Sequence, residues 1–181
     1  LSPEELWSSS AATDDEDYLR LLAAKPKKTQ LRRIQRGFVT TIADSSITCL
    51  SPPRFLEAVA AENNHSMVLR VATGHSSFLF SGDIENKVES ELASAFGSGV
   101  ASSVLKLPHH GSRTSSSSGF LDWVRPRLAV ISAPAYSSHG FPHREVSERL
   151  KQRGIRWLTT ARRGGIMIAS TPAGLEIEVS K

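Results

Sequence analysis

The sequence predicts an α/β fold, in which helices cover the faces of a sheet. In the second half of the chain, short apolar segments alternate with amphipathic ones. This alternation is typical of strands that are joined by helices packed against the same sheet. The expected strands are 103–107, 128–133 and 155–160, the expected helices are 118–124 and 144–154, and two closing strands cover 164–170 and 175–180.

The length and composition are those of a globular domain. The chain has 181 residues, of which 39% are hydrophobic and 22% are charged. A chain of this length can form one well-buried hydrophobic core, but it is too short for two domains that each have a full core. We therefore expect a single domain over residues 1–181.

The N-terminal part predicts a loop followed by a helix and a linker. Residues 8–17 are polar and acidic, and Asp15 or Asp17 can cap a short helix over 18–25. Pro26 ends that helix. The basic run "KPKKTQLRR" over 25–33 is then expected to be a solvated connection, as most runs of like charge are.

The middle of the chain predicts strand pairs and one helix. Its expected strands are 38–43, 46–50, 66–72 and 76–82, with a break at 51–55 and a turn at 73–75. A helix fits residues 84–96, because Ile84, Val88 and Leu92 recur every fourth residue on one face.

Charge and cysteine content exclude some classes of protein. Cys49 is the single cysteine, so neither an internal disulfide nor a cysteine-based zinc module is possible. The net charge of +4 leaves room for an anionic partner such as nucleic acid without requiring one. With no apolar run of 18 residues and no apolar leader, we expect neither a membrane span nor a secretion signal in these residues.

Two strand ends carry residues that could do chemistry. "FLFSGDIE" presents Asp83 after Gly82, and "LKLPHHGS" presents His109 and His110. Imidazole and carboxylate groups both bind zinc and manganese. Neighbouring histidines on an extended segment would point in opposite directions. Alternatively, Asp83 only caps the following helix, His109 is buried and hydrogen-bonded, and His110 is exposed.

The residues after the histidines suit a phosphate or a helix cap. In "SRTSSSS", Ser112 and Arg113 stand just before a helix whose N-terminus would favour a phosphodiester oxygen. The serines could equally act as caps without any substrate. His139 and His143 flank "GFP" before another helix, where capping or surface roles compete with substrate contact.

The motifs "GDIE", "LKLPHHGS", "AVIS", "GFPH" and a final "T…GGI" together resemble the C-terminal metallo-β-lactamase-like domain of the ComEC family of bacterial competence proteins. The resemblance covers roughly residues 30–181, and more faintly the segment "PEELW". It implies a metallo-β-lactamase-like αββα sandwich, of which this chain would be the C-terminal two-thirds. The His-x-His-x-Asp-His ligand motif of such domains does not occur in the sequence, so we expect an N-terminally truncated domain.

The resemblance also implies roles for individual residues. Asp83 would bridge two metal ions, and His109 would complete the ligands of one ion. His110 would be the alternative ligand, or it would orient the metal ligand or assist proton transfer. The cofactor would be one or two zinc or manganese ions. Ser112 and Arg113 would bind the substrate phosphate. Asn64 and His65, in "ENNHS", are weak further candidates.

The function implied is that of a metal-dependent phosphodiesterase, a nuclease acting on single-stranded DNA during competence-related DNA uptake. The domain would belong to a membrane-embedded DNA transporter and lie on the periplasmic side of the cell membrane. Without the missing motif we expect the 181-residue chain alone to be inactive. Two alternatives remain: a catalytically silent DNA-contacting module of such a transporter, or another metallo-β-lactamase-like hydrolase with a small-molecule substrate.

Overall fold

The computed structural model describes residues 3–9, 15–53, 62–136 and 139–181. The predicted loop at 8–17 and the predicted break at 51–55 therefore lie partly outside the described residues. All statements below concern the described part of the chain.

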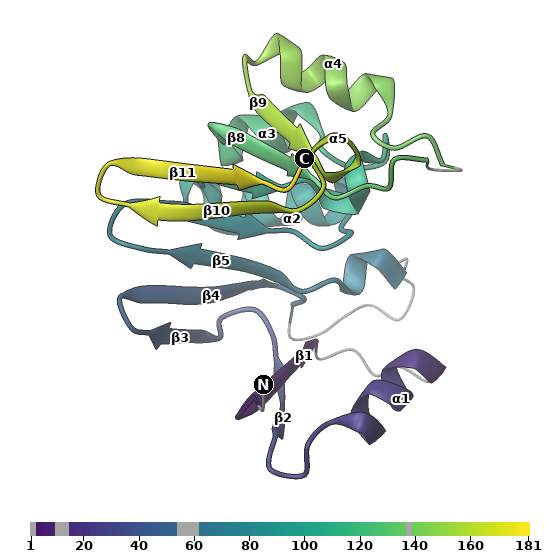
Figure 1. Cartoon of the computed structure of the whole chain (residues 1–181), viewed down its shortest axis with the longest axis vertical. Coiled ribbons are helices and arrows are strands. Elements are labelled where there is room, and N and C mark those ends of the chain that lie inside the picture. The colour runs from purple at the N-terminus through teal and green to yellow at the C-terminus, as the bar shows by residue number, and fades with distance from the viewer. Residues whose placement is uncertain (1–2, 10–14, 54–61, 137–138) are drawn as a thin grey trace.

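A seven-stranded mixed sheet forms the centre of the fold (Figure 1), and its strands are neighbours in the order in which they follow one another in the chain. Neighbouring strands run antiparallel from the first to the fourth strand of the sheet. From the fourth strand to the seventh they run parallel. The predicted α/β class is confirmed. The strands are β3 (Val39–Ile42), β4 (Ser45–Ser51), β5 (Val68–Ala72), β6 (Ser77–Phe80), β7 (Val104–Lys106), β8 (Leu128–Ile131) and β9 (Arg156–Thr159).

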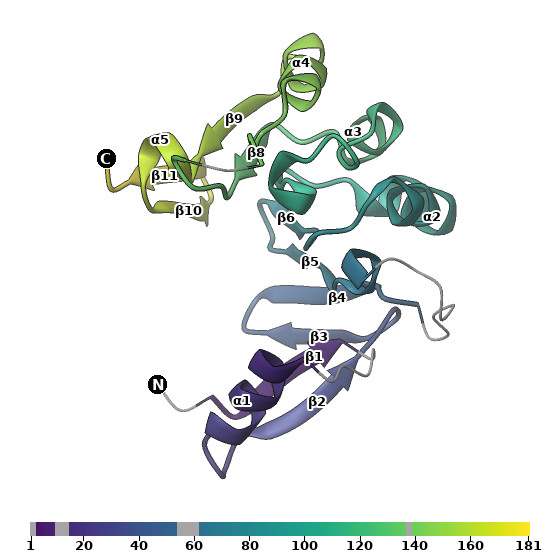
Figure 2. The same cartoon turned by 90° about the vertical axis from the view of Figure 1, so that its right-hand side faces the viewer.

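Helices cover one face of this sheet and a hairpin lies on the other (Figure 2). The covering helices are α2 (Asn86–Phe96), α3 (Ser118–Val124) and α4 (Arg144–Gln152), and they connect the parallel strands. The short helix α5 (Thr160–Arg163) leads into the hairpin of β10 (Ile166–Thr171) and β11 (Gly174–Val179). Three 3₁₀ turns complete this part: η1 (Glu62–His65), η2 (Gly97–Val100) and η3 (Pro108–Gly111).

The core lies between the sheet and the covering helices. Leu79, Leu105 and Ala129 from successive strands are fully buried, and Leu92 and Phe120 from the helices join them in one cluster. Each large apolar side chain buried in this way contributes roughly 1.5–3 kcal/mol. This packing holds the parallel strands in place, and with them the segments that follow their ends.

Helix α2 begins two residues later than the sequence predicts. The predicted apolar face is confirmed, because Ile84, Val88 and Leu92 are all buried. However, Glu85 occupies the N-cap position and the helix starts at Asn86. The interpretation of Asp83 as the cap of this helix is wrong, because Asp83 precedes the cap and its carboxylate faces other elements.

The N-terminal region confirms one prediction and corrects another. Asp15 caps α1 (Glu16–Ala24), where its carboxylate accepts a hydrogen bond of 2.8 Å from the Tyr18 N–H. The basic run at 25–33 is not only a connection, because its second half enters β2 (Gln30–Ile34), which pairs in parallel with β1 (Glu5–Ser9). Ile34 is buried while the arginines of the strand stay exposed. Burial of this one apolar side chain is therefore enough to form a strand in a segment whose charges predict a solvated linker.

A buried carboxylate fastens the serine-rich loop to α2. Glu89 accepts hydrogen bonds from the backbone N–H groups of Ser116 and Ser117, the second at 2.9 Å. Ser117 in turn caps α3, with its hydroxyl accepting from the Phe120 N–H. Arg149 of α4 donates to the carbonyls of the same loop. Capping therefore accounts for Ser117, and the N-terminus of α3 already faces a carboxylate.

Replacing Glu89 should destabilise the fold. In a Glu89→Gln variant, one of the two buried N–H groups faces an amide NH₂ instead of an oxygen, so we expect unfolding to be easier by about 1–3 kcal/mol in urea denaturation. Glu91→Gln on the same helix is the matched control, and it should change stability by less than about 0.5 kcal/mol. Equal stability of the two variants would contradict this account of the loop.

The same residue should make stability depend on pH. Burial raises the pKa of the Glu89 carboxyl above its ordinary value of 4.5, while the serine donors and Arg149 oppose the shift. A raised pKa means that the folded protein holds the proton more tightly than the unfolded chain does. The contribution of Glu89 to stability is thus greatest below pH 4.5 and declines as pH rises through the raised pKa. Urea denaturation across this range should show a decline that Glu89→Gln lacks.

Candidate active site

The two strand ends singled out in the sequence lie side by side. Strands β6 and β7 are parallel neighbours, with Phe80 opposite Lys106, so their carboxyl ends meet at one edge of the sheet. The connecting segments also touch, because the His109 N–H donates to the Gly82 carbonyl over 3.2 Å. The crossover through α2 therefore brings the acidic and the histidine segment together, as the sequence predicts.

Asp83 faces His110 across this edge. The Asp83 Oδ2 and His110 Nε2 atoms are 3.6 Å apart, too far for a hydrogen bond. The other carboxylate oxygen lies 3.4 Å from the Nζ of Lys106, which also donates to the Gly82 carbonyl over 3.0 Å. The backbone of Asp83 is held by the Ser66 hydroxyl, which accepts from its N–H. The carboxylate is thus fixed in place but remains 37% exposed.

A backbone carbonyl fixes the tautomer of His110. Its Nδ1 is 2.6 Å from the Ser132 carbonyl at the end of β8. Because a carbonyl oxygen can only accept, Nδ1 carries the proton, and in the neutral ring the lone pair of Nε2 faces Asp83. Metal-binding histidines commonly donate their other N–H in this way. The same orientation also suits a histidine that accepts a proton.

His109 forms a second pair with a residue that the sequence analysis did not single out. Its Nδ1 is buried without a hydrogen-bond partner and lies 3.6 Å from the Glu85 Oε1. The same Glu85 oxygen accepts from the Thr114 hydroxyl. Glu85 could have been found from its position two residues after Asp83 in "GDIE". The structure thus contains two acid–histidine pairs, Asp83 with His110 and Glu85 with His109.

The two histidines do not lie on an extended segment, and that prediction is wrong. His109 and His110 have φ values of +46° and +55° within the η3 turn, and Gly111 follows with +85°. The turn is closed by the Ser112 N–H, which donates to the His109 carbonyl. Left-handed backbone is uncommon for residues other than glycine and is concentrated at functional sites. The histidines reach different partners because of this turn, not because of strand alternation.

The remaining predicted residues surround these pairs at different depths. Asn64 is buried and its side-chain oxygen accepts from the Glu85 N–H, so it positions the acidic segment. The Nε2 of His65 is buried without a hydrogen-bond partner.

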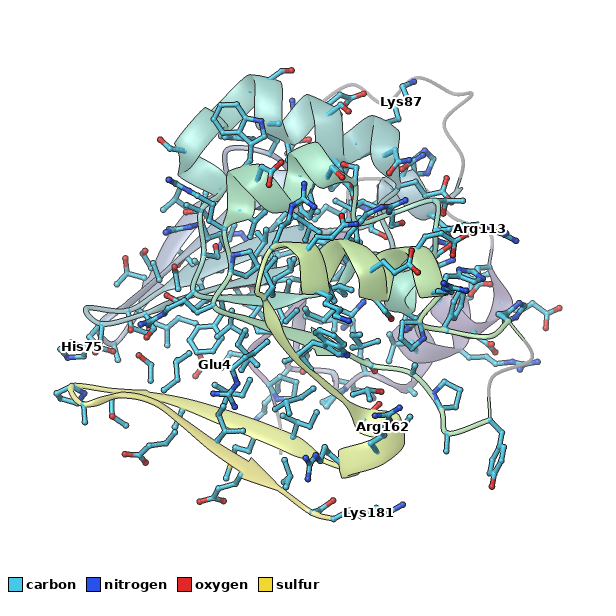
Figure 3. All side chains as sticks on the ribbon, turned by 90° about the horizontal axis from the view of Figure 1, so that it is seen from above. Glu4, His75, Lys87, Arg113, Arg162 and Lys181 are labelled. Carbon is cyan, nitrogen blue, oxygen red and sulfur yellow. The ribbon has the colours of Figure 1, made fainter. Side chains whose placement is uncertain are left out.

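Ser112 is buried, and its hydroxyl lies within hydrogen-bond distance of the Thr114 hydroxyl. Arg113 is exposed, and Figure 3 shows its side chain projecting outward. Phosphate binding by Ser112 and Arg113 stays a prediction.

His139 and His143 lie close to the histidine turn. His143 occupies the N-cap position of α4, but its side chain makes no capping bond. Its Nδ1 instead accepts from the Arg113 N–H over 3.0 Å. The ring of His139 stacks on Phe141, with the ring centroids 5.5 Å apart. The "GFPH" loop is therefore part of the surroundings of His110.

The carboxylate and imidazole groups at this edge of the sheet are suitable metal ligands, but they are few in number. Zinc binds imidazole and carboxylate at about 2.0–2.2 Å, so two ligands of one ion lie roughly 3–4 Å apart. Asp83 and His110 meet that separation without hydrogen-bonding to each other. In the described ranges, however, no group of three or more His, Cys, Asp or Glu side chains is arranged to hold a metal ion. Catalytic zinc sites usually have three protein ligands.

Comparisons with known proteins identify the fold and then the family. The structure resembles a protein of Parabacteroides distasonis that has provisionally been named a metal-dependent hydrolase, with a TM-score of 0.51 at 13% identity, covering 87% of this chain and 76% of the other. The chain thus shares the fold of this protein, which agrees with the predicted α/β class.

Two curated relatives identify the family. ComE operon protein 3 of Bacillus subtilis is 33% identical over 85% of this chain, and Competence protein ComA of Neisseria gonorrhoeae is 36% identical over 65%. The chain belongs to the ComEC family, as the motifs indicate. It spans 20% and 17% of the lengths of these two relatives. No family model matches the chain.

The packing of the histidine turn can be tested with a glycine substitution. A Cβ on Gly111 would lie 2.7 Å from the Cβ of Pro142, at a φ of +85°. We expect Gly111→Ala to lower stability by about 1–3 kcal/mol in urea denaturation. Gly119→Ala, in α3 with open space around it, is the control and should raise stability by about 0.5–1 kcal/mol. A Gly111→Ala variant as stable as the parent would contradict the prediction, because it would show that the turn can accommodate a Cβ at this position.

Proposed function

We propose that this chain is part of a metal-dependent nuclease that hydrolyses DNA phosphodiester bonds during DNA uptake. The observation that carries the proposal is the Asp83–His110 pair, two metal-binding side chains that face each other at 3.6 Å beyond neighbouring parallel strands. Membership of a family of competence proteins supports DNA as the substrate. The hydrolase fold supports the class of reaction.

Asp83 and His110 would hold a zinc or manganese ion through Oδ2 and Nε2, with further ligands from outside the described residues. Such an ion makes a water molecule nucleophilic at neutral pH and stabilises charge on the phosphoryl oxygens. Lys106 balances the negative charge of Asp83 and keeps its carboxylate at the sheet edge. The neighbouring pair of Glu85 and His109 is placed to accept a proton. Arg113 would attract the substrate phosphate.

The surroundings of the domain are part of the same proposal. Residues 1–181 would be one domain, the C-terminal two-thirds of the metallo-β-lactamase-like unit, on the periplasmic side of a membrane-embedded DNA transporter. Single-stranded DNA would be its substrate. In the described part of the chain, no helix is long and apolar enough to cross a membrane.

A second candidate is a DNA-contacting module without catalysis. It is favoured by the metal-donor count, since no three metal-binding side chains converge among the described residues, and by the net charge of +4. Such a module would bind DNA with a strong dependence on salt and would leave the strand intact. A metallo-β-lactamase-like hydrolase acting on a small ester is a third outcome that the same assays would detect.

Removing the Asp83 carboxylate should abolish hydrolysis while largely preserving the fold. In the protein as its gene encodes it, with manganese added, we expect Asp83→Ala to lower nucleotide release from single-stranded DNA by at least about a hundredfold. The exposed Asp44 in the β3–β4 turn provides the control, and Asp44→Ala should release nucleotides at the parent rate. Unchanged activity of Asp83→Ala would remove Asp83 from the site.

The parent protein separates the three candidate functions. Nucleotide release supports the nuclease, binding without release supports the silent module, and turnover of a small ester without nucleotide release supports the third candidate. The 181-residue chain tested alone should release no nucleotides. Full activity of this chain alone would overturn the proposal that further ligands lie outside it.

A further inference from the structure

We infer that the pocket beside His110 binds an unpaired nucleobase of a single-stranded DNA substrate, by stacking it against aromatic side chains. The inference rests on the proposed function for its substrate class and adds a subsite that reads the base rather than the phosphate. It is carried by the shape, the aromatic lining and the charge of this pocket.

The pocket opens directly beside the acid–histidine pair. Its volume is about 480 Å³, within the usual range for sites that bind small molecules. His110 belongs to its lining and faces Asp83 with its Nε2, so the pocket and the pair share one side chain. Its lining also includes Ser132, Pro134, Tyr136, His139 and Phe141.

One wall of the pocket is a stack of nearly parallel rings. The Phe141 ring lies 6.1 Å from that of His110 at an angle of 29°, and 5.5 Å from that of His139 at 26°. Tyr136 is 97% exposed and is free to turn toward a ligand. Aromatic platforms of this kind bind the flat faces of bases, with about 1–3 kcal/mol per stacked base.

The charge distribution favours a base over a phosphate in this pocket. Its described lining contains no Asp, Glu, Lys or Arg side chain. Arg113 is an exposed cation on the neighbouring loop: its backbone N–H donates to His143, and His143 in turn contacts Phe141 edge to face. A strand whose base enters this pocket would have its backbone close to the Asp83–His110 pair, because His110 belongs to both.

The position of the platform is fixed by the fold. The Thr160 hydroxyl accepts from the Ala133 N–H and donates to the Ala133 carbonyl, which joins the wall after β8 to the end of β9. On the other side, Gly111 packs against Pro142 so closely that a Cβ would not fit. A base inside a duplex is stacked and paired and could not enter such a pocket without being extruded. The pocket should therefore select single strands.

The experiment compares DNA with and without bases. The probes are a fluorescent ten-residue oligothymidylate and an oligomer of the same length and charge built from abasic nucleotides. Binding to the protein as its gene encodes it is measured by fluorescence anisotropy in chelator, separately from hydrolysis with manganese. We expect the parent protein to bind the thymidylate roughly tenfold more tightly than the abasic strand.

Two variants and a control attribute this preference to the pocket. Phe141→Leu should weaken thymidylate binding roughly tenfold and leave abasic binding unchanged. Tyr136→Ala, which removes a fully exposed ring and cannot disturb the core, should reduce the preference in the same sense. Trp123→Ala is the matched control, because this exposed ring lies at the far end of α3 next to Gly97 and should change nothing.

The outcomes distinguish the pocket from the proposed function. Equal binding of the two parent probes, or a preference that survives both pocket variants, overturns the nucleobase subsite even if hydrolysis is found. A preference that depends on the pocket in a protein that never hydrolyses DNA supports the subsite and overturns the nuclease. Loss of binding to both probes in Phe141→Leu would show that the ring only supports the loop, and it also overturns the subsite.

Discussion

The carbonyl of Gly82 is the junction on which the candidate site depends. It accepts a hydrogen bond from the His109 N–H and another from the Lys106 ammonium, so one oxygen joins the end of β6 to the end of β7 and to the histidine turn. Gly82 itself has a φ of +57°, and a Cβ there would lie 2.6 Å from the Cβ of Ser66. The acidic segment can lie this close to Ser66 only because Gly82 has no side chain.

The two acid–histidine pairs around this junction differ in their exposure and in the residues that surround them. The nearer pair, Asp83 and His110, is balanced by Lys106 and is partly open to solvent. The pair of Glu85 and His109 is less exposed and tied to Thr114 and to the buried Asn64. Glu89 holds the serine loop through the N–H groups of Ser116 and Ser117, so this buried carboxylate already occupies the N-terminus of α3. A phosphate bound at the proposed site would therefore meet Arg113 and Lys106 rather than the N-terminus of α3.

Much of the fold could be predicted because local patterns agree with the tertiary arrangement. The strand pair β5–β6, the helix face of Ile84, Val88 and Leu92, and the Asp15 cap all follow from periodicity or from one side chain's hydrogen bond. The strand β2 was missed because its arginines obey the rule for solvated charge runs, while a single buried residue, Ile34, anchors it to β1. Glu89 was missed because nothing local distinguishes this buried glutamate from the partly exposed Glu91 on the same helix.

The sequence by itself determined that Asp83 and the two histidines follow neighbouring parallel strands, since strand, helix and strand lengths suffice to bring such ends together. Only the tertiary structure decided which histidine meets which carboxylate. That choice depends on the left-handed backbone of His109 and His110, which is maintained by contacts with Gly82, Ser132 and Pro142 from three other segments. This uncommon backbone is held in a turn by hydrogen bonds and packing that form only when the sheet is complete.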